Sequence, residues 1–164
     1  TPYIPISADK SIKGDDIYVI GFPHGKVLSA ESKVTKGIIS AMQGIGNNFG
    51  QMQIDAAIQP GNSGGPVVNT KGELIGVTVS TADYKVWFDD FGSLPQNINF
   101  AIKAQMLALM LDSSNVKYYK SSKQMSIPEV DNATLYLECW STMAHYEKVK
   151  SNPIQLIGTV GSED

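Results

Sequence analysis

The sequence predicts an all-β fold: a six-stranded antiparallel β-barrel followed by a helix and a helical tail. Six short segments rich in β-branched and aromatic residues are separated by turns that contain glycine or proline. Their close spacing is typical of a small antiparallel barrel or sandwich. After residue 102 the pattern changes to a run of helix-forming residues without turn residues, which predicts a helix.

Each expected strand is bounded by its own turn signal. The third shows the alternation of a half-buried strand, because Met52 and Ile54 stand between polar neighbours. The fourth and fifth are joined by Thr-Lys-Gly (residues 70–72), a short hairpin signal. The expected strands are residues 15–22, 32–42, 51–58, 65–69, 73–80 and 96–102.

The barrel domain is assigned to residues 1–112, with its closing helix at 103–112, and the linker and helical tail to residues 113–164. The polar first part of the tail predicts a connecting segment. A helix is expected to begin at Asp131 and Asn132, because these residue types cap helices and apolar residues recur at helical spacing after them. The final residues, 152–160, are compatible with a short strand.

Composition and charge limit the classes of function. The chain has 164 residues, of which 42% are hydrophobic and 18% charged, enough for one globular domain with a core. A net charge of −3 argues against nucleic acid or an anionic membrane as the main partner, and no apolar run is long enough to span a membrane. The single cysteine, Cys139, excludes an internal disulfide. Because the sequence starts at Thr1 rather than methionine, we expect a fragment of a longer chain.

The stretch "QPGNSGGPVVN" (residues 59–69) is the strongest candidate for chemistry. A serine hydroxyl becomes a useful nucleophile only with a base to accept its proton and donors to stabilise the oxyanion. The glycines around Ser63 allow a tight turn, in which the amides of Gly61 and Ser63 point into one small pocket. The alternative is a glycine-rich turn with no catalytic role, so the flanking residues have to decide.

Those flanks resemble the nucleophile region of trypsin-like serine proteases, in particular the HtrA/Deg-type branch. The resemblance is carried by "QIDAAIQPGNSGGPVVNTKGELIGV" (53–77), preceded by "IYVIGFPHG" (17–25) with "VTKGIIS" (34–40) and followed by "INFAIKAQ" (98–105). It covers about residues 5–112. It implies that the chain forms the second barrel of that fold and acts as a serine endopeptidase, with Ser63 as nucleophile and the amides of Gly61 and Ser63 as oxyanion donors.

The resemblance also implies that the catalytic histidine and aspartate lie on a first barrel upstream of this chain. The fragment alone is therefore expected to be inactive. His24, in a turn, and His145, in the tail, are expected to have no catalytic role, and Asp55 to hold nearby loop amides rather than act as the triad acid. A non-catalytic trypsin-like module that binds a peptide or partner remains the alternative, which the upstream sequence would decide.

Substrate contacts follow from the same resemblance. The base of the primary specificity pocket would be Ala57, six residues before the serine, and without a charge there a preference for lysine or arginine is not expected. The fifth strand would pair with the substrate backbone. The implied substrate-binding residues are Ala57, Val77, Thr78, Val79, Asn99 and Ala101, and ordinary barrel packing is the alternative for all of them.

The implied partners are a polypeptide substrate and the upstream first barrel of the same protein, and the implied location is secreted or periplasmic. No cofactor is expected. No cluster of histidine, cysteine and glutamate has the spacing of metal ligands, so no metal site is expected.

Overall fold

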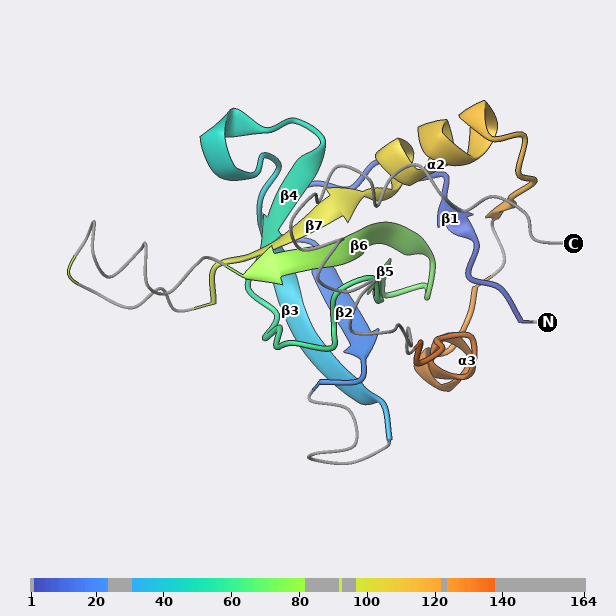
Figure 1. Ribbon diagram of the computed structural model, residues 1–164, viewed down its shortest axis with the longest axis horizontal. Coiled ribbons are helices and arrows are strands. Elements are labelled where there is room, and N and C mark those ends of the chain that lie inside the picture. Colours follow the sequence, from blue (N-terminus) through green and yellow to red (C-terminus); the bar gives the residue numbers. More distant parts are fainter. Residues whose placement is uncertain (1, 24–30, 82–91, 93–96, 122–123, 138–164) are drawn as a thin grey trace, which may run out of the picture.

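The computed structural model describes residues 2–23, 31–81, 92, 97–121 and 124–137. Six antiparallel strands form a closed barrel in the order β2-β3-β4-β7-β6-β5, because β5 pairs with both β2 and β6 (Figure 1). The predicted six-stranded antiparallel barrel with a following helix is confirmed. The barrel elements are β2 (Asp16–Gly21), β3 (Lys33–Ala41), β4 (Gln51–Ile54), β5 (Pro66–Asn69), β6 (Leu74–Thr81), β7 (Asn99–Lys103) and α2 (Ala104–Ser113).

Two short strands lie outside the barrel. The first, β1 (Ile6–Ser7), pairs in parallel with the start of β6, and β8 (Lys120–Ser121) pairs in parallel with β1. Neither strand was predicted, since two residues leave no periodic signal in a sequence. They attach the N-terminal segment and the segment after α2 to the edge of the barrel.

One expected strand is shorter than predicted. β4 ends at Ile54, whereas the sequence pattern favoured a strand to residue 58. The cause lies at Asp55, whose carboxylate accepts a hydrogen bond from the amide of Ile38 at 2.6 Å, so the side chain takes a donor from the neighbouring strand. The glycine-rich connection before β4 contains a single 3-10 turn, η2 (Ile45–Asn47).

The strands that face the helices are apolar on both sides. In β2, Ile17 and Val19 point into the barrel core, while Ile20 belongs to a separate cluster outside it. β5 divides in the same way, with Val67 inside and Val68 outside. This explains why β2 and β5 read as continuous hydrophobic runs rather than as alternating strands.

The two outer clusters are covered by helices. Ala104 and Ala108 of α2 pack on Ile6 and Leu74, and Val130 of α3 (Ile127–Asn132) packs on β2 and β5. Figure 1 shows α2, β1 and α3 on the same side of the barrel. The longest helix in the described ranges has ten residues. No helix in these ranges is long and apolar enough to cross a membrane.

The predicted start of the tail helix is wrong. α3 lies in what was expected to be the connecting segment, and it ends at Asn132, where a helix was expected to begin. The reason is a capping box: Ser126 and Glu129 satisfy each other's backbone groups, and Pro128 occupies the first turn. Residues 133–137 continue without helical structure, and the rest of the expected helix and the terminal strand lie outside the described residues.

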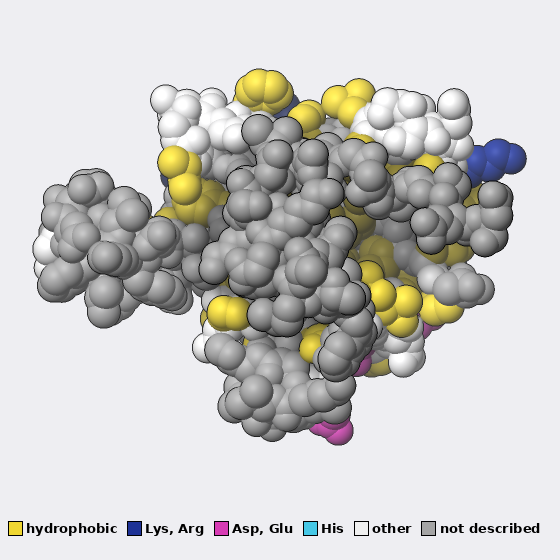
Figure 2. All heavy atoms as spheres, viewed as in Figure 1, with side chains coloured by type: hydrophobic (Ala, Val, Ile, Leu, Met, Phe, Trp, Pro, Cys, Tyr) yellow, Lys and Arg dark blue, Asp and Glu magenta, His cyan; other side chains and the backbone are white. Residues whose placement is uncertain are grey.

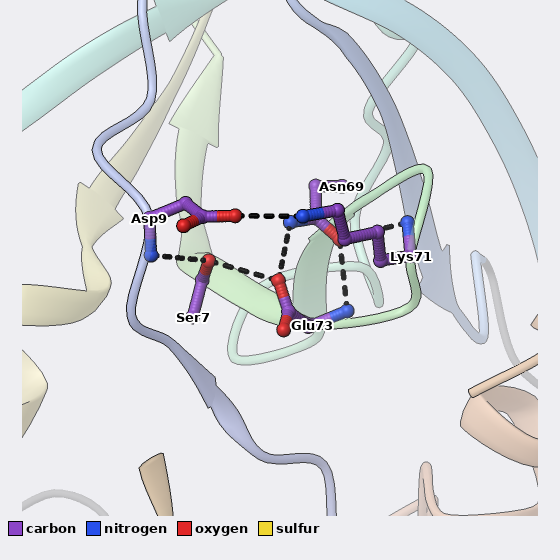
Figure 3. A network of polar contacts seen from close by, with 5 residues as sticks. All are labelled: Ser7, Asp9, Asn69, Lys71 and Glu73. Carbon is purple, nitrogen blue, oxygen red and sulfur yellow. Dashed lines mark hydrogen bonds and ion pairs between the residues drawn. The ribbon is translucent and has the colours of Figure 1, made fainter. Parts of the chain in front are cut away.

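A polar network fastens the N-terminal segment to the β5–β6 hairpin (Figure 3). The buried carboxylate of Glu73 accepts hydrogen bonds from Ser7 Oγ at 3.0 Å and from Asn69 Nδ2 at 2.8 Å. At its exposed end, Lys71 Nζ lies 2.7 Å from Asp9, and this hydrogen-bonded ion pair raises the pKa of Lys71 above its ordinary value. The N-terminal segment is thus held to the turn between β5 and β6, at Lys71 and Glu73.

Candidate active site

The loop that carries Ser63 is built from two consecutive tight turns. The amide of Asn62 donates to the carbonyl of Gln59 at 3.0 Å, and the amide of Gly65 donates to the carbonyl of Asn62 at 2.9 Å. Gly61 and Gly64 have φ angles of +104° and +83°, a region that side chains with a Cβ rarely adopt. The sequence therefore needs glycine on both sides of the serine, and Ser63 lies exposed at the tip.

Thr78 of β6 anchors this loop through its backbone and its hydroxyl. Its amide donates to the carbonyl of Gly65 at 2.9 Å, and its carbonyl accepts from the amide of Gly64 at 2.8 Å. Its hydroxyl lies within hydrogen-bond distance of the carbonyl oxygens of Asn62 and Gly65. Thr78 is only 2% exposed, so it holds the backbone on both sides of Ser63 from inside the protein.

The other side of the loop rests on β2. A Cβ placed on Gly21 would lie 2.8 Å from Asn62 Oδ1, and a Cβ on Gly65 would lie 2.4 Å from the carbonyl oxygen of Ile20. Both contacts are shorter than any real Cβ tolerates, so the loop can approach β2 only because these positions are glycine. Asn62 itself is buried, and its Oδ1 has no hydrogen-bond partner among the described residues.

The Ser63 hydroxyl donates to the carbonyl oxygen of Val79, 2.9 Å away. Among the described residues, no histidine or carboxylate side chain accepts a hydrogen bond from it. His24 and His145 lie outside the described residues. Asp55 is committed to the amide of Ile38, which agrees with the expectation that it holds backbone amides, although this amide belongs to a strand rather than a loop.

The substrate-contact candidates divide into exposed and buried residues. Ala57 is exposed, and its carbonyl accepts a hydrogen bond from Thr35 Oγ at 3.1 Å. Asn99 is buried, and its Nδ2 donates to the carbonyl of Ala56 at 2.8 Å, which fixes the backbone just before Ala57. Ala101 has no exposed surface and packs in the barrel core.

The three substrate-contact candidates on β6, Val77, Thr78 and Val79, differ in their backbone contacts. Val77 pairs with Pro66 of β5 and with Ile102 of β7. The backbone and hydroxyl of Thr78 are bound to the loop that carries Ser63, as described above. Val79 offers its carbonyl to Ser63, at an irregularity in the pairing of β6 with β7. The strand therefore passes directly beneath the serine.

A pocket of about 510 Å³ opens beside Ser63. One wall is the loop from Gly61 to Pro66, together with Phe22, and another is the segment from Ala133 to Leu137. No charged side chain is found among the described residues that line it. The described ranges also contain no group of three or more histidine, cysteine, aspartate or glutamate side chains that could hold a metal ion.

Comparison with known proteins gives a consistent result. Residues 1–77 match the family model described as "Trypsin-like peptidase domain". The chain is 38% identical over 118 residues to the serine endoprotease DegS of Escherichia coli strain K12. This match covers 68% of this chain and 30% of that protein. It is 41% identical over 98 residues to the probable periplasmic serine endoprotease DegP-like of Buchnera aphidicola subsp. Baizongia pistaciae, which covers 57% of this chain and 19% of that protein.

A solved structure agrees with these sequences. The crystal structure of the serine endoprotease from Yersinia pestis superimposes with a TM-score of 0.51 at 35% sequence identity, over 67% of this chain and 34% of that one. The chain belongs to the trypsin-like peptidase family, in its HtrA-type branch. This HtrA-type chain spans about a fifth to a third of the length of these relatives.

Some features around Ser63 were not predicted from the sequence. Thr78 anchors Asn62, which lies 16 positions earlier in the chain, and no local pattern reveals such a contact. In the sequence, Gly21 is one glycine at the end of an expected strand, and nothing there shows that the loop of Ser63 packs against it. The wall formed by residues 133–137 was hidden because this stretch was expected to be helical.

Proposed function

We propose that this chain is the nucleophile-bearing barrel of a serine endopeptidase that hydrolyses peptide bonds through an acyl-enzyme on Ser63. The observation that carries the proposal is the loop itself: an exposed serine flanked by two glycines with positive φ and anchored on both sides by Thr78. Membership of the trypsin-like family supports it, since relatives in that family are named serine endoproteases.

In this mechanism Ser63 Oγ attacks the carbonyl carbon of the scissile peptide bond. Its hydrogen bond to Val79 is given up, and its proton passes to a histidine on the upstream barrel, oriented by an aspartate there. The oxyanion that forms is stabilised by the backbone amides of Gly61 and Ser63. When the C–N bond breaks, the histidine returns the proton to the leaving amine, and a water molecule then releases the acyl group by the same steps in reverse order.

The substrate assignments follow from the resemblance to trypsin-like proteases. Ala57 forms the uncharged base of the primary specificity pocket, and Asn99 positions the backbone that leads into it. Val79 contributes the strand edge beside the serine and Val77 lines the pocket next to it, whereas the buried Thr78 and Ala101 support that edge from within the barrel. The substrate is a polypeptide, cleaved after small or medium apolar residues.

The remaining assignments follow the family. The partner is the first barrel of the same protein, the location is secreted or periplasmic, and the reaction requires no cofactor. Because the chain spans only part of its relatives, each of these is a proposal about the whole natural protein rather than about the 164 residues alone.

A fluorophosphonate probe, which reacts covalently with activated serines, tests the proposal. The natural protein with its upstream sequence should be labelled at Ser63, and Ser63→Ala should abolish labelling. Ser114→Ala, an exposed serine at the end of α2, is the matched control and should leave labelling intact. A natural protein that is folded but not labelled would instead support a non-catalytic module that binds peptides or a partner.

A further inference from the structure

The pocket of about 510 Å³ is lined by Ser63 and Val77, but by none of the other substrate-contact candidates, Ala57, Thr78, Val79, Asn99 and Ala101. It is therefore distinct from the proposed base of the specificity pocket at Ala57, and it meets the proposed substrate contacts at Ser63 and Val77. A polypeptide extends on both sides of the bond that is cut. If its acyl side lies against Ala57, the side that leaves as the amine continues past Ser63 toward this second pocket.

The far wall of the pocket is held in place by α3. Val130 is completely buried against Ile20 and Val68, and the capping box fixes the start of the helix. The amide of Met125, just before the helix, donates to the carbonyl of Lys71 at 2.8 Å. The chain therefore leaves α3 at a defined point, and residues 133–137 follow along the pocket.

An aromatic pair joins this wall to the nucleophile loop. The rings of Phe22 and Tyr136 lie 5.5 Å apart in a tilted arrangement, a favourable geometry for two aromatic rings. Phe22 also donates its backbone amide to the carbonyl of Gly61 at 3.3 Å. Tyr136 is thus one contact away from the loop that carries the proposed oxyanion donors.

Large apolar side chains lie exposed next to this contact. Leu135 is 71% exposed and Leu137 is 86% exposed. On the face shown in Figure 2, the described side chains at the surface are mainly hydrophobic, and charged ones are found at the margins. A pocket whose described lining has an apolar rim and no charged side chain favours an apolar side chain as its occupant.

We infer that residues 133–137, with Tyr136 held against Phe22, form the wall of a subsite for an apolar side chain on the leaving-amine side of the scissile bond. This inference rests on the proposed function, because it assigns part of the substrate of the same nucleophile. It makes Tyr136 a specificity-determining residue contributed by the segment after α3, outside the barrel.

The test uses the natural protein and internally quenched peptides that share one acyl side and vary after the scissile bond. Tyr136→Ala should lower kcat/KM by about tenfold for peptides with leucine or phenylalanine in the subsite, relative to peptides with glycine or aspartate there. Labelling by a small fluorophosphonate, which has no group on this side, reports in the same variant whether the loop of Ser63 is itself disturbed. Tyr119→Ala is the matched control, because Tyr119 is also exposed and ring-stacked, on Tyr3 at 4.7 Å, and does not line the pocket.

Two results would overturn the subsite. An unchanged cleavage profile in Tyr136→Ala would show that the wall contacts no substrate. Faster cleavage of every peptide together with faster labelling would show that residues 133–137 block the nucleophile instead of binding substrate. If the unmodified protein is not labelled at all, the proposed peptidase function is refuted, and the subsite with it. Labelling of the unmodified protein therefore distinguishes this outcome from a failure of the subsite alone.

Discussion

The hydroxyl of Ser63 lies 2.9 Å from the carbonyl oxygen of Val79 and donates a hydrogen bond to it. A carbonyl can hold this proton donor in place but cannot accept the proton, so the contact orients the hydroxyl of Ser63 without activating it. In the proposed mechanism a histidine from the upstream barrel competes with Val79 for the same hydroxyl. The state of the serine then depends on a part of the protein that lies outside these residues.

The anchoring of the loop by Thr78 gives the first prediction. Thr78→Val removes the hydroxyl but keeps a similar shape, and Asn62 and Gly65 each keep one backbone donor to their carbonyl oxygens. We therefore expect a loss of only about 1 kcal/mol in the free energy of unfolding, typical of one hydrogen bond. Labelling of Ser63 in the natural protein should slow by a larger factor than the stability loss explains.

Urea unfolding and the rate of fluorophosphonate labelling check this prediction together. Thr70→Val, in the exposed hairpin between β5 and β6, is the control and should change neither quantity. Labelling at the normal rate in Thr78→Val would show that the hydroxyl does not hold the loop.

The close approach of β2 to the loop gives the second prediction. Gly21→Ala would place a Cβ 2.9 Å from the Cα of Asn62, a backbone atom that can move only with the loop. Overpacking of this kind costs about 1–3 kcal/mol. Thermal unfolding should show the loss, and Ser63 should label more slowly. Gly50→Ala, where the nearest atoms are 3.3 Å away and belong to side chains, should be nearly neutral.

The buried carboxylate of Glu73 gives the third. Glu73→Gln removes the charge that accepts from both Ser7 and Asn69, so the N-terminal segment should detach more easily from the hairpin. Hydrogen bonds to a charged group contribute about 1.5–3 kcal/mol, and a loss of this size is expected in urea unfolding. Asp16→Asn breaks an exposed ion pair with Lys36 and should cost under about 1 kcal/mol. Equal effects of the two variants would contradict the role given to the network.

The uncharged base of the specificity pocket gives the fourth. The natural protein should cleave a peptide library after small or medium apolar residues, because Ala57 offers no partner for a cation. Ala57→Asp should shift the preference toward lysine and arginine. Dominant cleavage after lysine or arginine by the unmodified protein would show that Ala57 does not form the base of the pocket.

The barrel was predictable because its information is local. Turn residues and β-branched runs mark each strand, and the strand β2 shows both of its apolar faces in the run around Ile17 and Ile20. The loop of Ser63 was predictable for the same reason, since its glycines stand next to the serine. The sequence was less informative after Ser113, where the short helix α3 starts at a capping box rather than at a long apolar pattern.

The contacts around the loop were not predictable, because they join residues far apart in the chain. Thr78 meets Asn62 across 16 positions, and Phe22 meets Tyr136 across more than a hundred. A threonine in a strand looks the same whether it faces a substrate or holds a loop. Only the three-dimensional pairing of β5 and β6 distinguishes the two.

The most direct test of the central claim compares the isolated 164-residue chain with the natural protein in fluorophosphonate labelling. A nucleophile without its base retains only binding and oxyanion contributions, about 10³–10⁴ over water. The account predicts rapid labelling of the natural protein at Ser63 and none detectable in the isolated chain. Rapid labelling of the isolated chain at Ser63, abolished by His24→Ala, would contradict it and identify His24 as the base.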